Sequence, residues 1–98
     1  MENNHLIPLE NICSHYQVEI SFIHSLREYG LMEIHSVEGC DYMHPDHISA
    51  FEKMMRMHYD LEINFAGLDA ISHLLHRMHA LEQELNSLRN RLRIYEND

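Results

Sequence analysis

Histidine is the most unusual feature of this 98-residue sequence, because ten His side chains are present. His73, His76 and His79 follow one another at helical spacing, and Asp69 lies one helical turn before the first of them. Imidazole nitrogens and carboxylate oxygens arranged in this way on a helix can share a zinc ion. All three histidines fall on the outward side of the helix described below, so we interpret them as solvated side chains. We expect no metal site, and a net charge that becomes less negative between about pH 7 and pH 5.5.

The remaining reactive side chains do not form a catalytic pattern. Cys13 and Cys40 are too few for a disulfide framework and lack the CxxC spacing. No nucleophile–base pair, phosphate loop or pair of carboxylates is recognisable. We therefore expect a protein without catalytic residues or a cofactor. No signal peptide or membrane-spanning segment is recognisable either, which favours a cytoplasmic location and reduced thiols.

The longest regular pattern lies in the C-terminal third of the chain. Apolar residues recur there at alternating steps of three and four, uninterrupted by Pro or Gly. This is the heptad repeat of a coiled-coil helix roughly 37 Å long. The a and d positions are Ile71, Leu74, Met78, Leu81, Leu85, Leu88, Leu92 and Tyr95. We call these residues the dimer seam and expect them to face a second copy of the chain, because so short a chain has little core to cover them. The alternative is a single amphipathic helix folded back on its own domain.

Charges beside the seam bear on the orientation of such a dimer. In a parallel pair, three g-to-e contacts would be attractive: Arg77 with Glu82, Glu84 with Arg89, and Arg91 with Glu96. An antiparallel pair would instead place some like charges together, for example Glu82 beside its own copy. Exposed pairs contribute only about 0.2–1 kcal/mol each, so they select orientation more than they add stability. The sequence leaves the orientation open.

Shorter elements precede the long helix. We expect, in order, a helix opened by Ile7-Pro8-Leu9 and ending near Tyr16, a turn at 17–19, a helix over 20–29, a two-stranded wing within 31–43 and a helix over 45–59. Gly30 is a suitable end for the second helix, and Glu38-Gly39 is a suitable turn for the wing. Asn64 is the expected N-cap of the long helix, with Ile63 and Leu68 as a hydrophobic staple.

These elements predict a mainly α fold with a small β-wing. The predicted organisation is a winged helix-turn-helix head over residues 1–60, followed by a C-terminal dimerisation helix over residues 61–98. This order of elements resembles the MerR-like winged-helix superfamily. The residues that carry the resemblance are 12–18, Tyr29-Gly30-Leu31 and Gly39.

Within that superfamily, the stretch from Asp60 to Leu68 is similar to the hinge of the chaperone-modulator CbpM family. The family's order of Leu, Ile, Asn, Ala and Gly is matched by Leu61, Ile63, Asn64, Ala66 and Gly67. Glu62 stands where the family usually has Gly, which weakens the expectation of a left-handed turn there. The resemblance implies a non-enzymatic protein that binds the J-domain of a DnaJ-like co-chaperone, CbpA, on its basic helix and restrains its action on DnaK.

The alternative implied by the wider superfamily is a DNA-binding transcriptional regulator. Such regulators are expected to use basic residues of the second helix and wing, but the corresponding positions here are His24 and Asp41. Residues 1–60 contain three Lys or Arg and ten Asp or Glu, a net charge of −7, within a chain of net charge −9. Phosphate contacts require Lys or Arg, so this head should repel DNA.

The same acidic residues suit a basic protein partner. Our hypothesis is that Glu28, Glu33, Glu38 and Asp41 form the surface that meets a basic J-domain helix, although each could equally be an ordinary solvated carboxylate. His44-Pro45-Asp46 spells the HPD signature of J-domains themselves, but no basic helix precedes it. We interpret this tripeptide as the start of the third helix, with Asp46 favoured by the helix dipole.

Overall fold

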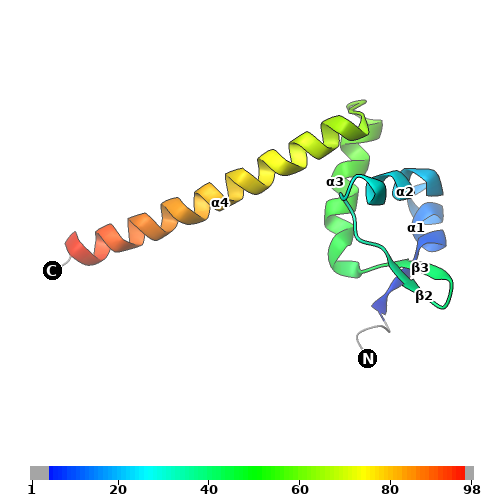
Figure 1. Ribbon diagram of the computed structural model, residues 1–98, viewed down its shortest axis with the longest axis horizontal. Helices are drawn as coiled ribbons and strands as arrows, with labels where there is room; N and C mark the ends of the chain where they lie inside the picture. Colours follow the sequence, from blue (N-terminus) through cyan, green and yellow to red (C-terminus); the bar gives the residue numbers. More distant parts are fainter. Residues whose placement is uncertain (1–4, 97–98) are drawn as a thin grey trace.

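Short amphipathic segments build an N-terminal head, and one uninterrupted helix projects from it (Figure 1). The computed structural model describes residues 5–96. In chain order, the elements are β1 (Ile7–Pro8), α1 (Leu9–Tyr16), α2 (Ile20–Glu28), β2 (His35–Val37), β3 (Cys40–Met43), the 3-10 helix η2 (Pro45–His47), α3 (Ile48–Tyr59) and α4 (Phe65–Glu96). The mainly α class with a small β-wing is confirmed. The principal extents of 59 × 38 × 20 Å reflect the projection of α4.

The helix-turn-helix unit consists of α1 and α2, as expected from the sequence. Gln17 ends α1 in a left-handed conformation with φ 58°, and the chain turns at once into α2. At the end of α2, Gly30 is also left-handed, and the N–H of Leu31 donates to the carbonyl of Leu26 at 2.8 Å. This bond satisfies a carbonyl that the end of a helix would otherwise leave without a partner.

The wing has three strands, whereas we predicted two. The sheet order is β1-β3-β2 and both pairings are antiparallel, with Ile7 opposite Met43 in the added pair. The prediction that Ile7-Pro8-Leu9 opens the first helix was therefore wrong at its first two residues. Pro8 is extended (φ −59°, ψ 140°) and helix α1 begins at Leu9. Proline suits both roles, because it tolerates an edge strand and the position just before a helix.

The predicted turn at Glu38-Gly39 is confirmed as the tip of the β2–β3 hairpin, where Val37 pairs with Cys40. Both turn residues have positive φ, 52° at Glu38 and 81° at Gly39. Two such residues in a two-residue loop match the twist of the adjoining strands. Glycine adopts this conformation without strain, whereas Glu38 must be held there by the pairing of the strands.

The core of the head draws on all its helices and on the first turn of α4. The buried apolar side chains are Leu9, Ile12, Phe22, Ile23, Leu26, Met32, Met43, Phe51 and Leu68. Leu68 of α4 is only 1% exposed, so the long helix is anchored in the head before it leaves it. The hydroxyl of Tyr16 donates to a carboxylate oxygen of Glu52 at 2.6 Å and ties α1 to α3.

The connection from α3 to α4 has the predicted cap and a sharper turn than we expected. Asn64 Oδ1 accepts from the N–H of Gly67 at 2.8 Å, and α4 begins at Phe65. A Cβ atom on Gly67 would lie 2.7 Å from Ile63 Cγ2, so only glycine lets Ile63 pack this closely. Glu62 has φ 58°, which means that the left-handed turn forms here despite the absence of glycine.

Candidate functional site

The four acidic residues of the predicted partner surface follow the chain from α2 to the wing. Glu28 lies in the last turn of α2, Glu33 in the connection, Glu38 at the hairpin tip and Asp41 in β3. The first three side chains are exposed, while Asp41 is half-buried and accepts from the hydroxyl of Ser36 at 2.7 Å. Within residues 5–96, no ion pair or hydrogen bond links any two of the four. Their side chains are therefore spread along the chain from α2 to β3, and we call these four residues the acidic edge.

Basic side chains are scarce along this edge. Arg27 is the one Lys or Arg in α2, and β2, β3 and their turn contain none. Glu28 is beside Arg27 and offsets its charge. The helix and wing of the head consequently offer few donors for phosphate oxygens.

The dimer seam lies along α4, and most of it is exposed in the single chain. Ile71, nearest the head, is half-buried, but Leu81 and Leu92 are 60% and 58% exposed. Leu75 and Ile94, which lie outside the seam, are also exposed. The head therefore covers only the beginning of the seam, which rules out the interpretation of α4 as a helix folded back on its own domain. No helix described here has both the length and the apolar character needed to cross a bilayer.

The outward histidines of α4 each pair within their own helix. His73 Nδ1 lies 3.9 Å from Asp69 Oδ1, and His76 Nδ1 donates to the Ser72 carbonyl at 2.8 Å. His79 lies against Gln83. Among residues 5–96, no group of three His, Cys, Asp or Glu side chains has a geometry that could hold a metal ion.

The His44-Pro45-Asp46 tripeptide starts a helix, as we interpreted it. Pro45 and Asp46 lie in η2, which leads directly into α3. The sequence did not predict the role of His44, whose Nδ1 accepts from the N–H of Asp46 at 3.0 Å and so caps η2.

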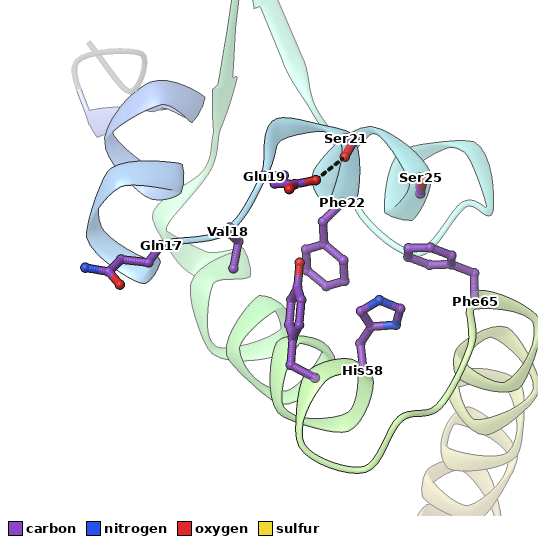
Figure 2. A pocket seen from close by; sticks show the side chains of 9 residues that line it. Gln17, Val18, Glu19, Ser21, Phe22, Ser25, His58 and Phe65 are labelled. Carbon is purple, nitrogen blue, oxygen red and sulfur yellow. Dashed lines mark hydrogen bonds between the residues drawn. The ribbon is translucent and has the colours of Figure 1, made fainter.

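A pocket of about 400 Å³ opens between the α1–α2 turn, α2 and the α3–α4 connection (Figure 2). Phe22, His58 and Phe65 meet along one side of it, and Glu19, Ser21 and Ser25 lie along α2 and the turn before it. The three rings pack against one another in a triangle, with centroids 5.1 Å apart for Phe22 and His58, 4.7 Å for His58 and Phe65, and 5.8 Å for Phe22 and Phe65. Gln17, Val18 and Tyr59 complete the lining.

Hydrogen bonds fix the orientation of two lining side chains. His58 Nδ1 lies 2.9 Å from the Ile63 carbonyl; since a carbonyl only accepts, Nδ1 donates and a neutral ring leaves Nε2 as an acceptor. The hydroxyl of Ser21 donates to Glu19 Oε1 at 3.3 Å. Burial raises the pKa of the Tyr59 phenol above its ordinary value, and the negative charge of Glu19 and then Cys13 raises it further. Tyr59 is therefore a neutral hydroxyl at neutral pH.

We did not predict this pocket from the sequence. Phe22 lies more than thirty residues before His58 and Phe65 in the sequence. No local spacing connects them, because they come from α2, α3 and α4. The available signal was the high aromatic content of the segment from His58 to Phe65, which flanks the hinge.

Comparison with known protein families gives one match. Residues 7–90 match the family described as MerR HTH family regulatory protein (MerR_2), a range that includes every element of the head and most of α4. Comparisons with curated proteins and with solved structures give no significant match. The helix-turn-helix, the wing and the long terminal helix all lie within the matched range. The chain therefore belongs to the MerR HTH family of regulatory proteins.

Proposed function

We propose that this family member is a non-enzymatic regulator that binds a protein partner: the J-domain of a DnaJ/CbpA-type co-chaperone, whose action on DnaK it restrains. The proposal is supported first by the acidic edge formed by Glu28, Glu33, Glu38 and Asp41, because a J-domain would present a basic helix to it. It is supported second by the likeness of the hinge, from Leu61 to Gly67, to the CbpM family. Charge complementarity of this kind raises the association rate and rejects wrong partners.

The DNA-binding alternative follows from the family itself, which is described as an HTH regulatory protein. The charge of the head argues against it. Affinity for duplex DNA comes largely from neutralised phosphates, and α2 and the wing supply only Arg27 for that purpose. We therefore place DNA binding second.

A pulldown with a purified J-domain tests the proposal. Reversing Glu28, Glu38 and Asp41 to Lys should abolish binding, and binding of the wild-type chain should weaken as salt is raised. A matched variant with Glu10, Asp46 and Glu84 reversed to Lys undergoes the same change in net charge at exposed sites outside the acidic edge and the hinge, and should retain most of the binding. Circular dichroism checks that both variants fold.

Two outcomes would contradict the proposal. If the triple reversal binds the J-domain as well as the wild type does, the interface lies elsewhere. If the wild type ignores the J-domain but shifts duplex DNA in a gel-shift assay at ordinary salt, the regulator is a DNA-binding one.

A further inference from the structure

We propose that the pocket between α2 and the α3–α4 connection binds one arginine side chain of the protein partner. We call it the aromatic pocket and define it by Glu19, Phe22, His58, Tyr59 and Phe65. The identity of that partner as a J-domain rests on the function proposed above. The pocket's preference for a guanidinium group rests on its own geometry and charge.

The aromatic walls suit a flat cation. Tyr59 is 49% exposed and its ring centroid lies 5.1 Å from that of Phe22, while His58 and Phe65 are half-buried and stacked nearly parallel, at 24°. A guanidinium group is planar and weakly hydrated, so it stacks on such rings more readily than an ammonium group does. The wall residues come from three packed helices, so their side chains are already ordered before a ligand binds. A flexible loop would lose conformational freedom on binding.

The polar side of the pocket suits the guanidinium N–H groups. Glu19 is an acidic lining residue, and no Lys or Arg belongs to the described lining. The Ser21 hydroxyl holds the Glu19 carboxylate on the rim and keeps its own lone pairs free to accept. His58 Nδ1 is engaged by the Ile63 carbonyl, so in the neutral ring its Nε2 adds an acceptor. A bound guanidinium would therefore find a charge-assisted acceptor and neutral acceptors together.

The aromatic pocket lies along the face of α2 that also carries Glu28, one residue of the acidic edge. Ser21, Ser25 and Glu28 follow one another at steps of four and three, so they share one face of α2. Beyond them, the ring of Tyr29 stacks on that of Phe65 at 5.8 Å and extends the aromatic wall. A basic helix lying along this face of α2 would meet Glu28 and could insert one arginine beside Glu19.

Two measurements on the full-length chain test the inference. In the first, N-acetyl-arginine amide is titrated while the aromatic NMR signals of His58, Tyr59 and Phe65 are followed, with neutral N-acetyl-citrulline amide as the isosteric control. The arginine probe should shift these signals with a dissociation constant roughly in the millimolar range, as expected for one side chain, and the citrulline probe should not.

In the second measurement, calorimetry gives the affinity of the J-domain for the variants Glu19→Gln, Tyr59→Leu and Glu10→Gln. The first two variants should weaken binding about threefold to tenfold, because each removes one element of the cation site. Glu10→Gln makes the same charge change on an exposed part of α1 and should leave affinity unchanged.

The outcomes separate this inference from the proposed function. If the wild type binds the J-domain and Glu19→Gln and Tyr59→Leu bind equally well, the aromatic pocket is not part of the interface, although the proposed function stands. If the J-domain does not bind but the arginine probe does, the pocket is a cation site and the partner is wrong. Equal shifts with citrulline, or no shift with either probe, overturn the inference.

Discussion

Single side chains in this protein connect elements that are distant in the sequence. The hydrogen bond from Tyr16 to Glu52 spans 36 residues and links α1 to α3, and the rings of Tyr16 and Phe51 lie edge to face at 5.4 Å. A hydrogen bond to an ionised group is stronger than one between neutral groups. Glu52 is partly exposed, so water can replace the Tyr16 hydroxyl as its partner. Loss of this hydroxyl should therefore cost only a modest part of the free energy of unfolding.

Tyr16→Phe should therefore lower the free energy of unfolding by about 1 kcal/mol at pH 7. The hydrogen bond to Glu52, then burial and then the charge of Glu52 raise the pKa of Tyr16 above its ordinary value of 10.0. A raised folded-state pKa means that this stabilisation is complete below pH 10 and disappears as pH rises through the folded value. The difference between wild type and variant should narrow accordingly above about pH 10.

Urea unfolding followed by circular dichroism, at pH 7 and again above pH 10, measures both effects. Tyr29→Phe is the control, because its hydroxyl makes no hydrogen bond to the described residues. An equal loss of stability for the two variants would mean that the Tyr16–Glu52 bond contributes no stability.

At the scale of elements, the α3–α4 connection combines a strained residue with a specific cap. Asn64 caps α4 and Gly67 leaves room for Ile63, so these two positions are well matched to their conformations. Glu62 is poorly matched to its left-handed conformation, because that conformation is about 1–2 kcal/mol less favourable for a residue with a Cβ atom. The turn forms because the bonds and packing on either side of it outweigh that cost.

Glu62→Gly should consequently stabilise the chain by about 0.5–1 kcal/mol, since relief of strain exceeds the extra freedom that glycine adds to the unfolded state. Thermal and urea unfolding would measure the gain. Glu33→Gly is the matched control at an exposed loop position with negative φ, where the same change should be neutral or destabilising. A destabilised Glu62→Gly variant would show that the glutamate side chain makes a contribution of its own.

At the scale of the whole molecule, the exposed seam of α4 is the main feature that a single chain leaves unexplained. Apolar side chains of Leu74, Leu81, Leu88 and others remain about half exposed or more along a helix that leaves the head. Burying one such side chain fully is worth about 1.5–3 kcal/mol, so a second copy would gain substantially from covering the seam. We therefore keep the homodimer as a prediction, in either orientation.

Replacing Leu81 and Leu88 with Glu should convert the dimer to a monomer in analytical ultracentrifugation. Gln83→Glu with Ser87→Glu adds the same charge on the outward side of α4 and should remain dimeric. A wild-type chain that sediments as a monomer at high micromolar concentration would refute the prediction. If the chain is dimeric, one cysteine introduced near either end of α4, with Cys13 and Cys40 replaced by Ser, reports the orientation, because only a parallel pair brings the two copies of that cysteine together.

Local patterns in the sequence were sufficient for much of the fold. The end of α1, the start of α2 and of α4, the left-handed end at Gly30, the hairpin turn at Glu38-Gly39 and the Asn64 cap were predicted, because each depends on residues within one or two turns of each other. The membership of the wider family also followed from the order of these elements. The acidic residues and the heptad positions can be read from the sequence because charge and spacing are properties of the chain itself, while their roles as partner surface and dimer seam stay predictions.

Only the tertiary structure decided the features that depend on distant contacts. The third strand forms because Ile7 and Pro8 meet β3 more than thirty residues later, and the left-handed turn at Glu62 forms because its surroundings impose it. The aromatic pocket exists because three helices bring Phe22, His58 and Phe65 together. Sequence spacing predicts the contacts between residues that are close in the chain. The third strand, the turn at Glu62 and the aromatic pocket are stabilised by packing between distant segments, and the spacing of residues does not predict which distant segments meet.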